Sequence, residues 1–489
     1  MSKIIRGKEK NWQVVIGLEI HAQVQSNSKL FSDSPTTFGE DQNTQVSLVD
    51  AAMPGMLPVL NGYCVEQAVR TGLGLNAEVN LFSIFDRKNY FYQDLPQGYQ
   101  ISQFKYPIIG NGSITISTDD GNDHIIGLER IHLEQDAGKS IHDQSPSETF
   151  VDLNRAGIAL MEIVTKPDMR SSEEAASFIK KLRSILRYLN TCDGNMEQGS
   201  LRCDANVSVM EEGGDQFGTR VEIKNLNSVK HIIKAIDFEA NRHVAILEGG
   251  GEIQQSTRLF DVNAGETKLM RLKEDVRDYR YFSDPDLLPL ELTEEYVESI
   301  RKTLPELPDA KHDRYVNDLR LSSYDASVIV ADRNIAEYFE QLVESLNLKS
   351  DAKLAANWLT SELFAKLNQT EIDIGNSPVV AQDMAHLLNM VSSNIISGKI
   401  AKNVFDIMFK TGKAADTIVQ EQGLQQISDT TELAVIIDDI VAANPDKLQQ
   451  YRDGKHKLLG FFVGQVMQQT KGAANPQIVN ELLLKRLSK

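Results

Sequence analysis

The spacing of apolar residues changes near Pro289, and this change constrains the fold more than any other feature of the chain. Before it, short runs such as 12–24 and 201–209 alternate apolar and polar residues, and turns rich in Gly and Asn separate them. A two-residue period is typical of half-buried strands, whereas a period of three to four residues indicates amphipathic helices. The longer period follows Pro289, in 293–303, 335–346, 352–367 and 381–391. The sequence therefore predicts an α+β part built on an antiparallel sheet, followed by a nearly all-helical part.

The chain has 489 residues, which is more than one hydrophobic core usually spans. We therefore expect an α+β domain at 1–292, a helical domain at 293–396 and a small helical bundle at 397–489. Two helices should interrupt the strands of the first domain. One follows the capping residues 171–174, and the other covers 227–247.

The charge and hydropathy of the chain exclude several classes of protein. The net charge is −18, so any contact with RNA must be local and cannot cover the whole surface. No apolar stretch approaches the roughly 18 residues that a membrane span needs. The first residues also lack the apolar run of a signal peptide. We therefore expect a cytoplasmic protein with no membrane partner.

The number and spacing of the cysteines argue against disulfide bonds and against a cysteine zinc site. Cys64, Cys192 and Cys203 are an odd number and have no C-x-x-C spacing. This pattern disfavours both a disulfide framework and a cysteine zinc site. We expect three buried, unpaired thiols.

Four strand-like segments carry ionisable or amide side chains at every second position, so these side chains share one face of their strand. They are Glu19 and His21; His132, Glu134 and Asp136, with Lys139 just beyond; Arg202, Asp204, Asn206 and Ser208; and Arg220, Glu222 and Lys224. One interpretation is the solvated face that an antiparallel sheet usually has. The other is a metal and phosphate site, because Mg²⁺ takes oxygen ligands and phosphate needs cationic partners. Spacing alone leaves both open. Glu19 with His21 would also suit Zn²⁺ or Mn²⁺, yet thiol-free, carboxylate-rich surroundings favour Mg²⁺.

Two further motifs bear on phosphate binding. Residues 136–140 resemble the end of a P-loop, but Leu133 stands where that motif needs its first Gly, so we exclude it. The run 86–92 mixes basic and aromatic residues, Lys88 among them. Such a run suits contact with phosphate or a base, and it also occurs on ordinary amphipathic strands.

Taken together, long stretches of the chain carry a family resemblance. They include Ile16-Gly17-Leu18-Glu19-Ile20-His21 and Leu133-Glu134-Gln135-Asp136-Ala137-Gly138-Lys139-Ser140, and further stretches lie at 54–61, 86–92, 98–103, 151–155, 199–206, 222–228 and 278–282. In this order they resemble the B subunit of the tRNA-dependent aspartyl/glutamyl amidotransferase. Residues 462–467 and 470–476 resemble that family's YqeY-like tail domain.

The resemblance implies a fold and a reaction. The fold is a cradle-shaped catalytic domain around an antiparallel sheet, then a helical domain and the tail. In the reaction, ATP converts the side-chain carboxylate of misacylated Glu-tRNA(Gln) or Asp-tRNA(Asn) into an acyl phosphate, which ammonia displaces. ATP and Mg²⁺ are the implied cofactors. Which of the two tRNAs is used stays open.

The family takes its ammonia from a separate glutaminase. This chain has no Gly-Gly-Ser-Ser run of the amidase-signature type and no N-terminal catalytic Cys. The implied partners are therefore an amidase-signature A subunit, a small C subunit that completes a heterotrimer, and the misacylated tRNA. Two alternatives remain, a non-catalytic tRNA-binding or assembly subunit and an independent Mg²⁺-dependent phosphohydrolase.

Matching motifs carry residue roles over from the family. Glu19, His21 and Glu134 are implied as catalytic metal ligands, with Asp204 and Glu222 as further ligands and Lys88 as another catalytic residue. Contact with phosphate or substrate is implied for Lys139, Arg202, Asn206 and Lys224. Some members carry a second Glu at position 135 and a Lys at 97, where this chain has Gln135 and Gln97. Others carry Cys-Pro-x-Cys where Ser47-Leu48-Val49-Asp50 stands, so no zinc is expected here.

The end of the chain is the basic part of an acidic protein. Residues 451–489 hold seven Lys and Arg against two acidic residues. One interpretation is a solubilised bundle. The other is the surface that holds the tRNA body, with Lys455, Lys457 and Lys471 as contacts beside turns.

Overall fold

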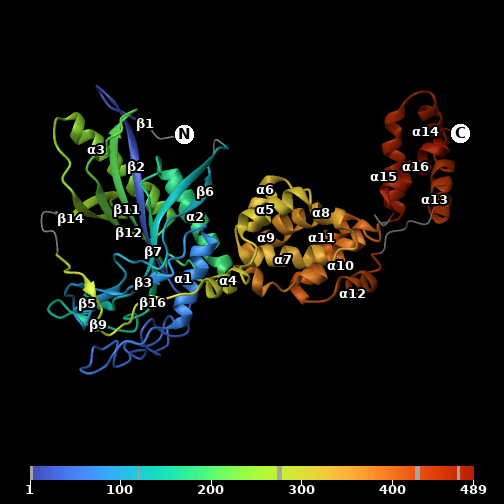
Figure 1. Ribbon diagram of the computed structural model, residues 1–489. Helices are drawn as coiled ribbons and strands as arrows, with labels where there is room; N and C mark the ends of the chain where they lie inside the picture. The colour runs from blue at the N-terminus through green and yellow to red at the C-terminus, as the bar shows by residue number, and fades with distance from the viewer. Residues whose placement is uncertain (1–3, 119–120, 273–277, 425–429, 471–473, 489) are drawn as a thin grey trace. The chain divides into compact units, whose positions relative to one another are not determined.

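The computed structural model describes residues 4–118, 121–272, 278–424, 430–470 and 474–488. The chain divides into two compact units, Met1–Pro308 and Asp309–Lys489 (Figure 1). All described strands lie in the first unit and form a largely antiparallel sheet, while the second unit is helical. The predicted α+β class is therefore confirmed. The domain limits at 292 and 396 stay a prediction.

Nine strands form the main sheet, in the order β14-β13-β12-β11-β2-β10-β7-β6, and β1 pairs with β2 at one end. Neighbours are antiparallel except β12 and β13, which are parallel. The strands are β1 Ile4–Arg6, β2 Asn11–Gln23, β6 Gly112–Ser117, β7 Asp123–Gln135, β10 Ala159–Thr165, β11 Leu201–Glu211, β12 Val221–Leu226, β13 Ser256–Asp261 and β14 Glu266–Leu272. The long central strands β2, β7 and β11 make up the middle of the unit (Figure 1).

Three helices pack against this sheet: α1 (Gly62–Gly74), α2 (Ser172–Leu189) and α3 (Val229–Glu248). Both α2 and α3 begin at a serine. The Ser171 hydroxyl accepts a hydrogen bond from the Glu174 amide, and the Ser228 hydroxyl accepts one from the His231 amide. α2 ends at Asn190 in the left-handed conformation. Both helices that the sequence predicts are present.

The two faces of the sheet differ in chemistry because successive side chains of a strand point to opposite sides. On β2, the side chains of Ile16, Leu18 and Ile20 are fully buried in the core that the helices also line. Gly17, Glu19 and His21 alternate with them and therefore belong to the other face. The helices thus cover one face of the sheet and leave the second face for polar side chains.

Short strands build the surroundings of that second face. β4 (Asp86–Asn89) pairs with β5 (Tyr99–Ser102) and with β15 (Phe282–Ser283), which brings the run 86–92 beside 279–282. The other short strands are β3 Phe82–Ser83 with β16 Leu290–Glu291, and β8 Lys139–Ile141 with β9 Phe150–Asp152. Helix α4 (Glu294–Arg301) packs against α1, so it belongs to the first unit.

The second unit contains two groups of helices. The first group is α5 Pro308–Asn317, α6 Ser323–Val330, α7 Arg333–Glu344, η1 Lys349–Asp351, α8 Ala352–Asn357, the π-helical turn η2 Trp358–Leu363, α9 Phe364–Thr370, η3 Ile374–Asn376, α10 Ala381–Ser392, α11 Gly398–Thr411 and α12 Ala415–Gln422. The second group, here called the tail bundle, is α13 Thr430–Ala442, α14 Pro445–Arg452, η4 His456–Leu458, α15 Leu459–Gln469 and α16 Pro476–Leu487. The tail bundle has a hydrophobic core of its own, which includes Leu433, Phe462 and Leu483. Within the described residues, no helix is both long and apolar enough to cross a membrane.

Candidate functional site

The pairing register lines up polar side chains across four neighbouring strands. His21 of β2 lies opposite Arg202 of β11 on one side and opposite Glu162 of β10 on the other. Glu162 in turn lies opposite His132 of β7. Glu134 is two residues further along β7, so its side chain is on the same face. The open face of the sheet therefore gathers residues that are far apart in the sequence.

Four of these side chains form one group, which we call the His–Glu cluster: His21, His132, Glu134 and Glu162. The His21 Nε2 atom lies 3.3 Å from a Glu134 oxygen and 3.4 Å from a Glu162 oxygen. The His132 Nε2 atom lies 3.4 Å from Glu162 and 3.5 Å from Glu134. The Ser102 hydroxyl donates a hydrogen bond of 3.2 Å to Glu134. Two imidazoles therefore alternate with two carboxylates.

The charges of the cluster depend on one another. Burial alone would lower the pKa of His21, but its hydrogen bonds to Glu134 and Glu162 outweigh burial and raise the pKa to about 10. Burial would also lower the pKa of His132, but the carboxylates of Glu162 and Glu134 raise it to about 9. Burial would raise the pKa of Glu134, yet the two histidines lower it to about 2. Without a metal ion, protonated imidazoles therefore balance the carboxylates.

The donor atoms of the cluster fit a divalent cation. One ligand atom each from His21, Glu134 and Glu162 lies within 4.8 Å of the other two, and the part of the chain that the structure describes holds no other such group of three. His132 contributes a buried Nδ1 atom with no hydrogen-bond partner among the described residues. Carboxylate oxygens suit Mg²⁺, and the imidazoles also suit Mn²⁺ or Zn²⁺.

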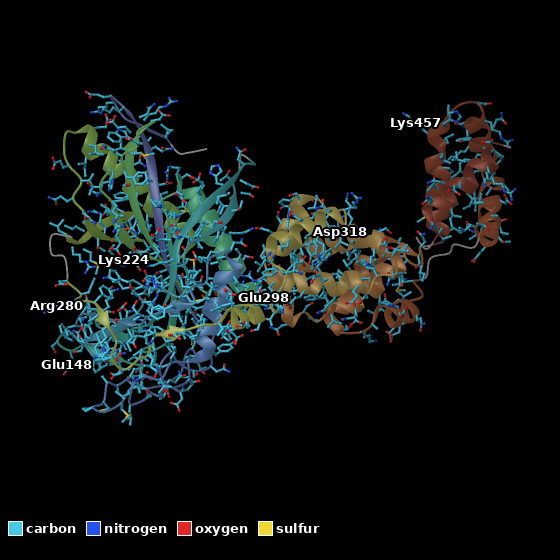
Figure 2. All side chains as sticks on the ribbon, viewed as in Figure 1. Glu148, Lys224, Arg280, Glu298, Asp318 and Lys457 are labelled. Carbon is cyan, nitrogen blue, oxygen red and sulfur yellow. The ribbon has the colours of Figure 1, made fainter. Side chains whose placement is uncertain are left out.

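A second acidic group lies next to the cluster, on β2, β11 and β12. The Glu19 carboxylate accepts a hydrogen bond of 3.2 Å from Asn206, and burial, followed by the charges of Glu162 and Glu222, raises its pKa. Lys224, labelled in Figure 2, forms ion pairs with Asp204 and, at 2.9 Å, with Glu222.

The structure therefore places Asp204 and Glu222 around a lysine and does not gather them with His21 and Glu134. The metal-binding role predicted for these two carboxylates stays a prediction.

Two cations border the cluster. The Lys88 Nζ atom lies 5.2 Å from the centre of the Tyr279 ring. Burial would lower the pKa of Lys88, but the charges of Glu134 and other nearby acidic groups raise it. On β11, Arg202 donates a hydrogen bond of 2.9 Å to Asp136. Both side chains bring positive charge to the border of the cluster.

Aromatic side chains make a continuous row next to Lys88. Neighbouring rings have centroids 4.3 to 6.1 Å apart, and the row runs through Tyr92, Tyr90, Tyr279, Tyr281 and Phe104. The Tyr90 hydroxyl donates to Gln100, whose amide donates to the backbone carbonyl of Gln135, directly after Glu134. The predicted basic and aromatic run thus forms one wall of the site.

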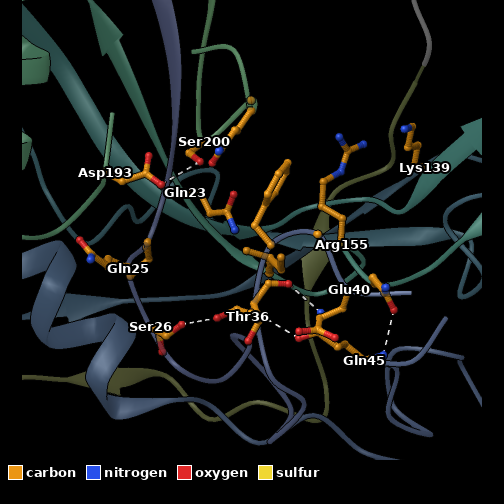
Figure 3. A pocket seen from close by; sticks show the side chains of 18 of the residues that line it. Gln23, Gln25, Ser26, Thr36, Glu40, Gln45, Lys139, Arg155, Asp193 and Ser200 are labelled. Atoms are coloured by element: carbon orange, nitrogen blue, oxygen red, sulfur yellow. Dashed lines mark hydrogen bonds between the residues drawn. The ribbon is translucent and has the colours of Figure 1, made fainter. Parts of the chain in front are cut away.

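A cavity of about 620 Å³ lies where β2 ends, and Gln23, two residues beyond His21 on that strand, lines it (Figure 3). Its lining includes Gln23, Thr36, Glu40, Lys139, Arg155 and Ser200. Arg155 also lies 3.4 Å from Asp136, the partner of Arg202. Lys139, predicted for phosphate contact, therefore lines this cavity and lies outside the His–Glu cluster.

Sequence reasoning missed Glu162. It is the single ionisable residue in the otherwise apolar strand Ala159–Thr165. A lone carboxylate inside such a strand is a signal that could have been used, because an unpaired charge is costly to bury. His132 shares a predicted strand face with Glu134, but the sequence motifs gave it no role of its own.

The residues predicted to bind tRNA lie in the tail bundle. Lys455 and Lys457 are exposed in the segment that joins α14 to α15. Figure 2 labels Lys457. Lys471 lies outside the described residues.

Comparison with models of known protein families identifies the class of protein to which this site belongs. A family model described as the GatB/GatE catalytic domain matches residues 14–298, which include all members of the His–Glu cluster. A second model, described as the GatB domain, matches residues 337–487. The sheet and its cluster therefore belong to a catalytic domain of the amidotransferase class.

Several relatives match this chain over nearly its whole length, and they show the family within that class. The B subunit of the aspartyl/glutamyl-tRNA(Asn/Gln) amidotransferase from Rickettsia rickettsii (strain Iowa) is 58% identical over 99% of both chains. The protein of the same name from Wolbachia pipientis is 59% identical over 98% of this chain and 99% of its own, and that from Pelagibacter ubique is 56% identical over 99% and 98%. The chain belongs to the family of these amidotransferase B subunits.

Proposed function

We propose that the chain carries the site at which the side-chain carboxylate of Glu-tRNA(Gln) or Asp-tRNA(Asn) is phosphorylated by ATP and then amidated. The observation that carries the proposal is the His–Glu cluster with Lys88 and Arg202 at its border. It lies in the domain that matches the catalytic family model. The names of the relatives supply the tRNA substrates and imply further subunits.

The reaction has two steps. An oxygen of the substrate carboxylate bonds to the γ-phosphorus of ATP while the bond from that phosphorus to the β–γ bridging oxygen breaks, and ADP leaves. Ammonia then attacks the acyl carbon, loses a proton and displaces inorganic phosphate, which leaves the amide. We expect a glutaminase A subunit to supply the ammonia and a small C subunit to complete the heterotrimer.

The residues of this chain position the reactants. His21, Glu134 and Glu162 would hold Mg²⁺, which when bound neutralises phosphate charge. Lys88 and Arg202 offer cations to the substrate carboxylate and to the transferred phosphate, where charge builds up in the transition state. The buried position of the cluster limits the access of water to the reactive acyl group.

The experiment measures ADP release by the purified heterotrimer with and without misacylated tRNA and Mg²⁺. We expect release that depends on both, and we expect His21→Ala to abolish it while glutaminase activity persists at least in part. ADP release without tRNA at the same rate would instead favour an independent phosphohydrolase. Normal amidation by His21→Ala would favour a non-catalytic, tRNA-binding role for this chain.

A further inference from the structure

Another cavity lies at the end of the main sheet away from the His–Glu cluster. Its volume is about 560 Å³, and its walls come from the start of β2, the end of β11, the loop that follows β11 and the last turns of α3. Figure 1 shows α3 and β1 at this end of the first unit, opposite β5 and β9. Trp12, which lines the cavity, is about 30 Å from His21 along the extended strand β2. A small ligand in this cavity therefore does not reach the cluster.

The charged side chains of this cavity have one sign. Glu211, Asp215 and Glu252 line it, and none of the described residues that line it is a lysine or an arginine. Asp215 and Glu252 are exposed, and neither forms an ion pair with a described residue. A concave surface with uncompensated negative charge attracts cations and repels phosphate and other anions. The lining therefore favours a cationic ligand.

The acidic side chains are not arranged for a bare metal ion. Among the described residues, only the His–Glu cluster brings three possible ligand atoms within 4.8 Å of one another. A divalent cation needs several oxygen atoms around one point, and the carboxylates of this cavity do not converge in that way. A larger, organic cation suits their spacing better.

Aromatic and aliphatic side chains form the rest of the wall. Trp12 and Phe217 contribute rings, and Met210 and Leu247 contribute aliphatic groups. The Trp12 indole N–H donates a hydrogen bond of 2.7 Å to Glu248, which fixes the ring. Aromatic faces attract ammonium groups, most strongly in the case of tryptophan. An alkylammonium group combines a charge with methylene groups and so matches both parts of the lining.

A buried histidine supplies an unused hydrogen-bond acceptor. His243 lines the cavity although its side chain is fully buried. Its Nε2 atom lies 3.0 Å from Glu239, which is ionised because its hydrogen-bond donors outweigh burial and lower its pKa to about 2. A carboxylate only accepts hydrogen bonds, so Nε2 carries the proton and Nδ1 of the neutral ring is an acceptor. Nδ1 has no partner among the described residues, and an N–H group of a ligand would satisfy it.

Two cations of the chain itself already contact groups of this cavity. Lys10 forms an ion pair with Glu211, and the guanidinium carbon of Arg170 lies 5.9 Å from the centre of the Phe217 ring. Lys10 and Arg170 are not among the residues that line the cavity. The two unpaired carboxylates and the histidine acceptor are therefore left for a ligand.

We propose that this cavity binds an alkylammonium group, with its charge beside Asp215 and Glu252, its methylene groups against Trp12 and one N–H donated to His243 Nδ1. A free polyamine and the lysine side chain of another protein chain share this chemistry. The volume of about 560 Å³ is within the range of small-molecule sites, roughly 300 to 1,000 Å³, and it admits either one.

The test titrates spermidine by calorimetry into the full-length chain and into the heterotrimer, at physiological ionic strength so that weak surface contacts are screened. We expect saturable binding to one site per chain. Asp215→Asn and Glu252→Gln should weaken binding by about threefold each and on the order of tenfold together, because both carboxylates are exposed. The matched control is Glu148→Gln, an exposed acidic residue outside the cavity, which should leave binding unchanged (Figure 2).

A second probe separates hydrogen bonding from charge without any change to the protein. Spermidine with fully methylated, quaternary nitrogens keeps its positive charges but has no N–H group. We expect it to bind on the order of tenfold more weakly, because it leaves the buried His243 acceptor without a donor. Phe217→Ala should weaken the binding of both probes alike, since attraction of a cation to an aromatic ring needs no N–H group.

The two sources of the ligand give different results. Binding of spermidine to both the chain and the heterotrimer identifies a site for a free polyamine. Binding to the chain alone identifies a site that a lysine of a partner subunit fills in the heterotrimer. The proposal is overturned if neither form shows saturable binding, if Glu148→Gln weakens binding as much as the cavity variants do, or if the two probes bind equally well.

Discussion

At the scale of single residues, the His–Glu cluster is a balanced set of charges. Two carboxylates buried side by side would repel each other, and one would hold a proton. His21 and His132 prevent this by supplying positive charge to both. A divalent cation would take over the same task, and its binding would release protons from the imidazoles. The two carboxylates are therefore balanced by positive charge both without a metal ion, when the histidines are protonated, and with a metal ion bound.

The first prediction concerns Glu162. Glu162→Gln keeps the size of the side chain but removes the charge that His21 and His132 share. We expect amidation to fall on the order of a thousandfold, because loss of a metal ligand removes several kcal/mol of transition-state stabilisation. Glutaminase activity of the assembled heterotrimer should persist at least in part. The matched control is Glu291→Gln, an exposed residue of β16, and amidation by Glu162→Gln within a few fold of this control would refute the role.

At the scale of secondary-structure elements, a buried carboxylate joins α3 to the edge of the main sheet. Glu239 of α3 is fully buried and accepts hydrogen bonds from His243, Arg242 and Thr267, the last of which belongs to β14. Burial would raise the pKa of Glu239, but these donors outweigh it and lower the pKa to about 2. The negative charge of Glu239 therefore stabilises the packing of α3.

The second prediction follows from the sign of this shift. A carboxylate whose pKa is lowered by folding contributes stability above its unfolded pKa, about 4.5, and loses that contribution as the pH falls towards 2. We expect Glu239→Gln to lower the free energy of unfolding at pH 7 by roughly 3–5 kcal/mol. The difference from wild type should shrink below about pH 4.5. Denaturation at several pH values measures this, and a difference that does not change with pH, or one matched by exposed Glu252→Gln, would contradict it.

Another buried ion pair organises the segment between β2 and α1. The Lys29 ammonium is fully buried and donates to the Asp50 carboxylate at 3.0 Å and to the Gln45 carbonyl at 2.7 Å. Asp50 also accepts hydrogen bonds from the Ser47 amide and the Ser32 hydroxyl. One ammonium therefore holds together a segment that has no regular secondary structure of its own.

The third prediction is that Lys29→Met destabilises the first unit by roughly 3–5 kcal/mol, because it leaves Asp50 buried without its cation. Adding Asp50→Asn should recover part of the loss, since the second change removes the unpaired charge. Thermal denaturation of both variants is the measurement. A double variant no more stable than Lys29→Met would show that the ion pair is not the source of the effect.

The fourth prediction concerns metal content. Ser47 and Asp50 stand where the family resemblance places thiols, and Asp50 is already paired with Lys29. The three cysteines are buried and free. We therefore expect no structural zinc, because such sites need about four Cys or His ligands. Elemental analysis of the dialysed protein tests this, and about one retained zinc per chain would disprove it.

The helices and strands themselves could largely be predicted from the sequence, but which strands pair with one another could not. The runs 12–24 and 201–209 correspond to β2 and β11, and the two predicted helices correspond to α2 and α3. Local periodicity and capping residues determine these elements. The cluster instead depends on the pairing of β2 with β10 and of β10 with β7, which no local pattern encodes. For this reason, the sequence did not indicate Glu162, and it did not indicate that Lys224 pairs with Asp204 and Glu222.

At the scale of the whole molecule, charge is unevenly distributed. The chain is acidic overall, yet 451–489 contains seven basic and two acidic residues. Some of these cations are engaged within the tail bundle, as Arg486 is by Asp438 at 3.0 Å. Lys455, Lys457 and Lys485 are exposed and have no ion pair with any described residue. The tail bundle therefore exposes lysines that are not neutralised by a described acidic residue. An acidic protein that binds an anionic tRNA needs such a local basic surface.

The structure also shows where the tail bundle can be removed. α11 and α12 pack against α10, so a chain that ends within them would expose the core of the helical group. The tail bundle begins after them, at Thr430, and has its own core. A chain that ends at Leu424 leaves α10, α11 and α12 whole.

The last prediction is that this shortened chain still assembles with its partners but binds tRNA more weakly. Each phosphate contact that is lost should reduce the slope of log affinity against log salt concentration by roughly 0.7 to 0.9. The loss of three exposed lysines would then reduce the slope by about two units, which titrations at several salt concentrations resolve. Lys455→Ala with Lys457→Ala in the full chain should give about two thirds of that change, because two of the three contacts are removed. An affinity and a slope equal to those of the full heterotrimer would show that the tail bundle does not bind the tRNA.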